Sequence, residues 1–205
     1  MKRALLAVMF VVALASHANA AGPISFGLHL NGASINVDGP LKDAYNIGYG
    51  GGVHLDIGVI PIVDVRINGD YITFSLDDTK TKNYVASVNP GTVAGSFGLD
   101  GGRINILSIG VNGKVGLPTP LLSPYATGGL GMARISFTDL TVSYPGFQPA
   151  TFPGGGSQTK FSANLGAGAD LKLAIITIYL ELKYTWIFTD GATSTYVPVT
   201  LGVTF

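Results

Sequence analysis

Apolar side chains recur at every second position in two segments near the C-terminus. In one segment they are Ile178, Leu180, Leu182, Tyr184, Trp186 and Phe188, and in the other Val197, Val199, Leu201, Val203 and Phe205. The positions between them are mostly polar or small, as at Glu181, Lys183 and Thr200. A period of two indicates β-strands that have one apolar face and one polar face.

The same alternation predicts eight strands, which are 24–36, 47–59, 63–71, 103–117, 125–137, 161–173, 178–188 and 196–205. Their connections alternate between tight turns, near Pro61 and Ile175, and longer links that include 75–101 and 138–159, both expected to be loops. In an up-and-down barrel every second connection lies at the same end, so all the long loops share one end. The facing is ambiguous in the upper part of 103–117 and in 125–137, where we orient the strand by turning Arg134 away from lipid.

The first twenty residues predict a secretory signal peptide that is cut after Ala20. A basic start is followed by an apolar stretch from Ala4 to Ala15 and by small residues at Ala18 and Ala20. A membrane-anchoring helix is the alternative, and it is disfavoured because a spanning helix needs about 20 apolar residues. We therefore expect a single domain over residues 21–205, exported through the periplasm.

Composition narrows the class of protein. Only 12% of the residues are charged, against about 25% in ordinary soluble domains. There is no basic excess that would indicate a nucleic-acid partner, and no cysteine for a disulfide. No apolar run after residue 20 is long enough to form a spanning helix. The chain therefore needs either a large buried core or an apolar face turned to lipid.

Alternation alone does not decide between a soluble barrel of the lipocalin type and a membrane barrel. Four features favour the membrane: the leader, the terminal Phe205, the glycines on the polar face and the aromatic residues near the strand ends. The expected interfacial aromatics at the long-loop end are Tyr49, Tyr71, Phe137, Phe161, Tyr184, Trp186 and Phe188, and those at the other end are Phe26, Tyr125 and Phe205. We predict an all-β, eight-stranded antiparallel up-and-down transmembrane β-barrel.

The ending Val199–Phe205, the segment Ser123–Arg134 and the eight-strand layout resemble small Gram-negative outer-membrane barrels of the OmpA, OmpX and OmpW type. The resemblance covers the whole mature chain but includes no motif specific to one subfamily. It implies an outer-membrane location and outer-membrane lipids around the barrel. It also implies an assembly signal, read by the outer-membrane assembly machinery, at Val199, Leu201, Val203 and Phe205.

Ten charged residues are assigned to the inside of the barrel: Asp56, Asp64, Arg66, Asp70, Lys114, Arg134, Asp170, Lys172, Glu181 and Lys183. Hairpin register predicts that Asp56 faces Arg66, that Lys172 faces Glu181 and that Asp170 faces Lys183. Opposite charges at facing positions attract. We expect this network to close the lumen, because eight-stranded barrels are only wide enough for side chains to fill; the alternative is a gate or a proton or ion path.

The residues give little support for catalysis or for a cofactor. His29 and His54 fall on inward positions without a partner serine on the lipid face, and no spacing suits a metal. Gly154–Gly156 lacks the strand-to-helix context of a phosphate-binding loop.

Three functions remain open. The first is a structural or surface-interaction barrel, whose long extracellular loops contact surface polymers, host molecules or neighbouring proteins. The second is a narrow channel for small or hydrophobic molecules, with a funnel formed by Ala86, Val88, Val93, Ala94, Phe97 and Leu99. The third, least favoured, is a lipid-modifying enzyme.

Overall fold

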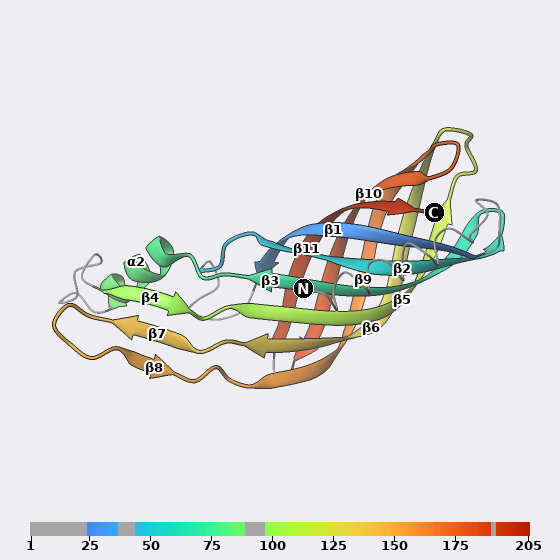
Figure 1. Cartoon of the computed structure of the whole chain (residues 1–205). Helices are drawn as coiled ribbons and strands as arrows, with labels where there is room; N and C mark the ends of the chain where they lie inside the picture. The colour runs from blue at the N-terminus through green and yellow to red at the C-terminus, as the bar shows by residue number, and fades with distance from the viewer. Residues whose placement is uncertain (1–23, 37–43, 89–96, 190–191) are drawn as a thin grey trace, which may run out of the picture.

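Eight long strands form a closed antiparallel barrel, in the order β1-β11-β10-β9-β6-β5-β3-β2 (Figure 1). The computed structural model describes residues 24–36, 44–88, 97–189 and 192–205. The barrel strands are β1 (Ile24–Asn36), β2 (Gly48–Ile60), β3 (Val63–Phe74), β5 (Ile104–Gly116), β6 (Leu122–Phe137), β9 (Ser157–Lys172), β10 (Thr177–Thr189) and β11 (Ala192–Thr204). The eight-stranded antiparallel prediction is confirmed, whereas the signal peptide predicted at 1–20 lies outside the described residues.

The barrel closes where the first strand meets the last. β1 and β11 pair over ten positions, and the Phe205 amide donates to the Phe26 carbonyl at 2.8 Å. From Leu30 on β1, the paired residues can be followed from strand to strand around the barrel in either direction. One direction reaches β6 at Arg134, and the other reaches it at Pro124. That stagger of ten residues tilts the strands and leaves a lumen that side chains can fill.

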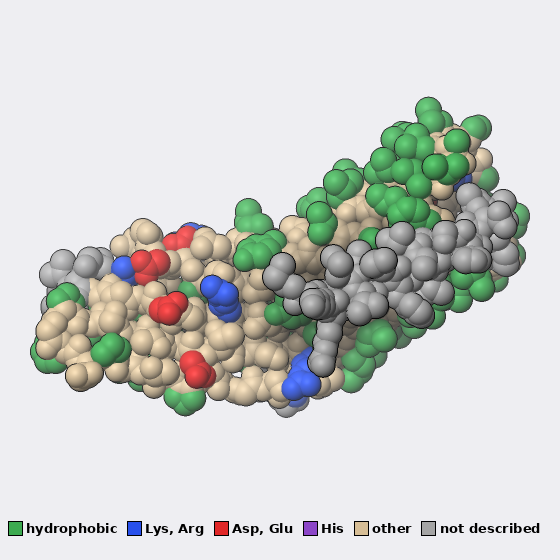
Figure 2. Space-filling view, viewed as in Figure 1, with side chains coloured by type: hydrophobic (Ala, Val, Ile, Leu, Met, Phe, Trp, Pro, Cys, Tyr) green, Lys and Arg blue, Asp and Glu red, His purple; other side chains and the backbone are tan. Residues whose placement is uncertain are grey.

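Large apolar side chains cover the outside of the barrel. Along β10 the burial alternates position by position, with Leu180 and Leu182 exposed and Glu181 and Lys183 buried. In Figure 2 these apolar side chains form a belt over the barrel, while most charged side chains in view lie beyond one end of it. A soluble barrel has the opposite arrangement, so the prediction that the apolar face points outward is confirmed.

The two longest connections are folded rather than irregular, which corrects the expectation of plain loops at 75–101 and 138–159. The first contains α2 (Asp78–Val88) and β4 (Gly98–Gly101), and the second contains β7 (Leu140–Ser143) and β8 (Ala150–Phe152). These strands pair in the order β4-β7-β8. Together with α2 they form what we call the outer platform, which extends the molecule beyond one end of the barrel (Figure 1).

Local interactions explain why the outer platform folds. Asp77 caps α2, because its carboxylate accepts from the Lys80 amide at 3.0 Å, and Asp78 pairs with Lys82 one turn later at 2.6 Å. Phe97, just before β4, is buried against Tyr144 with ring centroids 5.5 Å apart. No helix in the described part of the chain is long and apolar enough to cross a membrane.

Short turns connect the strands at the other end of the barrel. The β9–β10 turn comprises residues 173–176, with the Leu173 amide donating to the Ile176 carbonyl at 2.8 Å. The predicted facing of Lys172 with Glu181 requires a four-residue turn at 175–178, two positions later than the observed turn. The difference shifts the β9–β10 register and changes which lumen charges face one another.

Candidate functional site

Arg66 lies at the centre of the barrel lumen and is almost fully buried. Its Nε and Nη2 donate to the two carboxylate oxygens of Asp56 at 2.6 and 2.7 Å, which makes a bidentate pair. The β2–β3 register sets Asp56 directly opposite Arg66, as the hairpin predicted. The guanidinium also stacks on Tyr179, at 4.7 Å from the ring centroid.

Glu181 joins this pair to the opposite wall. Its carboxylate lies 3.4 Å from Arg66 Nη1 and 3.1 Å from Lys183 Nζ, and it accepts from the Tyr125 hydroxyl at 2.9 Å. The predicted facing of Lys172 with Glu181 is wrong, because the observed turn sets Gly168 opposite Glu181. Glu181 therefore obtains its partners from other strands and from its own strand two residues away.

Lys114 and Asp170 form a second ion pair nearer the short-turn end, with Nζ 2.7 Å from Oδ2. The predicted facing of Asp170 with Lys183 is wrong for the same reason of register, since Asp170 lies opposite Tyr179. Asp64 lies opposite Lys114. An open vestibule of about 180 Å³ is lined by Asp56, Asp64, Lys114 and Asp170, among other residues.

A hydrogen-bonded histidine cluster lies above Arg66, toward the outer platform. His29 Nε2 is 2.6 Å from the Asp70 carboxylate, to which Asn31 also donates at 3.0 Å. The His29 ring stacks on His54 with centroids 5.7 Å apart, and His54 Nε2 is 3.0 Å from the Thr204 hydroxyl. The sequence predicted that both histidines point inward, and this is confirmed. This series of side chains, from Asp70 through His29 and His54 to Thr204, could transfer a proton, but both imidazole rings are buried inside the barrel.

A cluster of buried apolar side chains, which we call the apolar plug, lies in the lumen at the end that carries the outer platform. It consists of Ala33, Ile72, Phe74, Ile104, Ile106, Ala133, Ile135, Ile187 and Tyr196. Tyr45 packs against it from the connection before β2, and burial raises the pKa of that phenol. Below the plug lies a cavity of about 20 Å³, near the size of one water, lined by Asn31, Asp70 and Lys183 among others. The plug was not predicted from the sequence, although Ile104 and Ile106 on inward positions were a signal for it.

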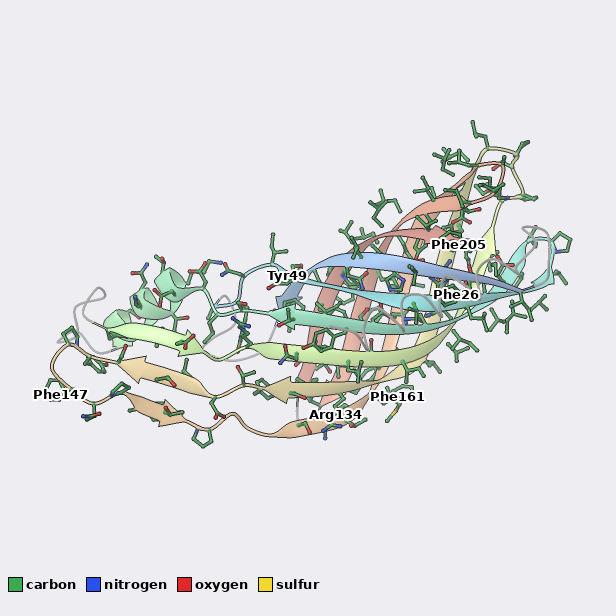
Figure 3. The ribbon with its side chains drawn as sticks, in the orientation of Figure 1. Phe26, Tyr49, Arg134, Phe147, Phe161 and Phe205 are labelled. Atoms are coloured by element: carbon green, nitrogen blue, oxygen red, sulfur yellow. The ribbon has the colours of Figure 1, made fainter. Side chains whose placement is uncertain are left out.

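Two residues assigned to the lumen lie elsewhere. Arg134 is on the outward face of β6, exposed, and donates to the Ser157 hydroxyl at 2.9 Å (Figure 3). The assumption that a charged residue must point away from the apolar outer face led to the wrong facing for Arg134. Lys172 is exposed at the end of β9, with Nζ 3.4 Å from the Thr119 carbonyl, because the turn starts immediately after it.

The predicted interfacial aromatics mostly face outward. Tyr49, Tyr71, Tyr184 and Phe188 are between 43% and 67% exposed, and Trp186 packs beside Tyr184 with centroids 4.8 Å apart.

One of the other aromatic assignments, that of Tyr125, is wrong. Tyr125 is 5% exposed inside the barrel, because the odd positions of β6 point inward, whereas Phe137 at the end of the same strand is 39% exposed.

The C-terminal positions Val199, Leu201, Val203 and Phe205 share the outward phase of β11. Phe205 lies beside Phe26 across the barrel seam, as Figure 3 shows. No cluster of histidine, aspartate or glutamate residues suited to a metal ion occurs within the described ranges.

Comparison with known proteins gives one family match. The sequence model described as "Outer membrane protein beta-barrel domain" matches residues 4–205. No curated protein matches the sequence.

Several solved structures are similar in shape and distant in sequence. Neisserial surface protein A (NspA) is 13% identical, with a TM-score of 0.56 over 89% of this chain and 96% of its own, which shows the fold alone. Ail, the attachment invasion locus protein of Yersinia pestis, is 13% identical over 89% of this chain and 97% of its own, with a TM-score of 0.48. The N-terminal β-barrel domain of Pseudomonas aeruginosa OprF is 15% identical over 88% and 97%, with a TM-score of 0.46.

Proposed function

This chain belongs to the family of outer-membrane β-barrel domains, and from that premise we propose that it is a closed barrel whose role is to hold the outer platform at the cell surface. The family places the protein in the Gram-negative outer membrane. The observation that carries the proposal is the direct pairing of the two longest connections, where β4 pairs with β7 from Gly98 with Ser143 to Gly101 with Leu140.

The outer platform is suited to contact other molecules because it is ordered and carries exposed aromatic side chains. Phe147, in the β7–β8 turn, is 78% exposed, and Tyr144 and Phe152 are 42% and 56% exposed. Figure 3 shows Phe147 at the tip farthest from the barrel. Aromatic residues are enriched at protein interfaces, where they supply a large contact area at a low cost in conformational entropy.

The lumen contents support a closed barrel rather than a channel. From the short-turn end, the vestibule is followed by the Arg66 and Glu181 layer, the histidine cluster and the apolar plug. The vestibule and the 20 Å³ cavity share no lining residue. A lateral break has no support in the described strands, because hydrogen-bonded pairing continues around the whole barrel.

The funnel suggested for a channel has no support in the residues that the structure describes. Phe97 is 4% exposed and packs inside the outer platform. The side chains of Ala86, Val88, Val93 and Ala94 lie outside the described set.

We also propose that the protein has no catalytic activity. His29 and His54 are buried in the lumen, and their side-chain partners are Asp70, Thr204 and Tyr179, with no serine nucleophile among them. The alternative of a lipid-modifying enzyme would require such a pair on the lipid face.

We propose that outer-membrane lipids surround the apolar belt and that the assembly machinery reads the C-terminal strand. The strand offers Val199, Leu201, Val203 and Phe205 as one continuous outward face. The edge of β11 pairs with β1 when the barrel closes, so before closure the same residues are available to the assembly machinery.

Replacing the β7–β8 hairpin tests the surface role. Because Leu140 pairs with Phe152, a two-residue turn can replace residues 141–151 without displacing the barrel strands. Cells that display this variant should lose adhesion to glycan-coated or protein-coated surfaces, while the barrel keeps its heat-modifiable migration on gels.

A photo-crosslinking side chain at Phe147 provides a second readout. In intact cells it should form adducts that the same group at Leu165, on the lipid-facing belt, does not form. Unchanged adhesion of the hairpin variant together with identical adducts from both positions would contradict the proposed role.

A further inference from the structure

We propose that Arg134, with Arg103 above it, binds the phosphate group of a lipid in the outer leaflet. Arg134 is the one charged residue at an outward position within the described barrel strands. It alternates with exposed Met132 and Leu130 on β6, so its side chain leaves the wall on the lipid side. A charged residue on that face is uncommon in membrane barrels because lipid-facing charges are destabilising.

The surroundings of Arg134 place it at headgroup depth. One step toward the short-turn end, Met132 pairs with Phe161, whose ring stacks on Phe188 with centroids 5.9 Å apart. Aromatic rings collect at the membrane interface. Figure 3 shows Arg134 and Phe161 close together on the outside of the barrel.

The wall becomes polar immediately beyond Arg134. Thr73 donates to Asn105 at 2.8 Å on the outward faces of β3 and β5, and Ser136 lies opposite Ser157 on β6 and β9. Arg134 itself lies opposite Thr159 and Leu107. The guanidinium therefore meets the last apolar side chains on one side and hydroxyl groups on the other, which is the boundary where lipid phosphates lie.

Neither arginine forms an ion pair with an acidic residue that the structure describes. The only side-chain bond of Arg134 within the described residues is to the Ser157 hydroxyl, at 2.9 Å. Arg103 is exposed, uses its backbone to bond Thr138, and forms no ion pair in the described part of the chain. The Asp139 carboxylate, the acidic group next to Thr138, accepts from the Gly154 amide at 2.8 Å.

Two guanidinium groups without an acidic partner among the described residues therefore lie near the outer boundary, one on β6 and one just before β5. Arg103 bonds the backbone of Thr138, four residues beyond Arg134, so the two α-carbons are about 13 Å apart along the wall. A guanidinium binds phosphate with two parallel hydrogen bonds, whereas hydroxyl groups can donate the remaining ones. This combination fits a phosphorylated lipid better than a zwitterionic or neutral one.

Native mass spectrometry of the detergent-solubilised barrel tests the site. The probes are a diphosphorylated lipid A, the same lipid with its phosphates removed, and inorganic phosphate. The wild type should retain the phosphorylated lipid and bind the other two weakly. Arg134→Gln should reduce the bound fraction about three- to tenfold, since the lost hydrogen bonds involve a charged group near solvent.

Two variants separate a lipid site from a general effect of charge. Lys80→Gln, which removes an exposed positive charge from α2, should bind lipid like the wild type, while Arg134→Lys should retain part of the binding. Arg103→Gln should weaken binding less than Arg134→Gln. Equal retention of phosphorylated and dephosphorylated lipid, or equal losses in Arg134→Gln and Lys80→Gln, would overturn the proposal.

Discussion

Removing the Arg66 guanidinium should destabilise the barrel more than any change on its surface. In Arg66→Met the Asp56 carboxylate loses two hydrogen bonds, of 2.6 and 2.7 Å, and stays buried. Breaking one partner of a buried ion pair costs about 3–5 kcal/mol, because the remaining charge has no compensation. Glu181 keeps Lys183 and Tyr125, so the loss concerns mainly Asp56.

The double variant Asp56→Leu/Arg66→Met is the matched control. It removes both charges, and replacing a whole buried pair by apolar groups is often close to neutral. We therefore expect it to recover at least about 2 kcal/mol relative to Arg66→Met alone, which gives a large coupling energy in the double-mutant cycle.

Chemical unfolding in lipid vesicles measures these differences. The chain has a single tryptophan, and Trp186 lies on the outward face of β10, so its emission reports directly on removal of the barrel wall from lipid. An Arg66→Met variant within about 1 kcal/mol of the wild type, or a double variant whose loss equals the sum of the single losses, would refute this reasoning.

Two further predictions concern the filling of the lumen. Gly202→Ala should cost about 1–3 kcal/mol, because the new methyl group meets the Tyr179 ring, whereas Gly32→Ala, where nothing lies within 4 Å, should leave the unfolding midpoint unchanged; equal effects would contradict the packing seen here. Planar-bilayer recordings of the purified protein should show no large, stable conductance steps, since the charged layers and the apolar plug fill the lumen, and such steps would refute the closed barrel.

The strands and their facing could be predicted from the sequence because a period of two is local. One residue and its neighbours two positions away are enough to assign a face, as along β10 from Ile178 to Phe188. The bidentate pair of Asp56 and Arg66 followed from the same logic, because the short turn at Pro61 fixes the register of its hairpin.

Other parts of the site depended on contacts between distant segments. The β9–β10 turn could be placed only within two residues, and that error changed the expected partners of Lys172, Glu181 and Asp170. The assignment of Arg134 failed because the sequence does not give the depth of a residue in the membrane.

The outer platform and the apolar plug join residues that are far apart in the chain. β4 and β7 are about 40 residues apart, and no local pattern in either segment indicates the partner. The plug was hidden because Ile72, Ile104 and Ile187 are apolar residues on the face that is polar elsewhere. The sequence signal of the plug was a local break in the alternation of apolar and polar positions. The nearness of these residues to the strand ends does not by itself explain that break.

The most direct test of the account is to measure the environment of every residue along β10 in lipid vesicles. The chain lacks cysteine, so single cysteines from 178 to 188 can carry spin labels without other changes. We predict that labels at even positions collide with oxygen dissolved in the lipid, and that labels at odd positions are reached by neither oxygen nor a water-soluble nickel complex. Ready access of the nickel complex to the odd positions would show a water-filled lumen, and its access to the even positions would show that the apolar face does not meet lipid.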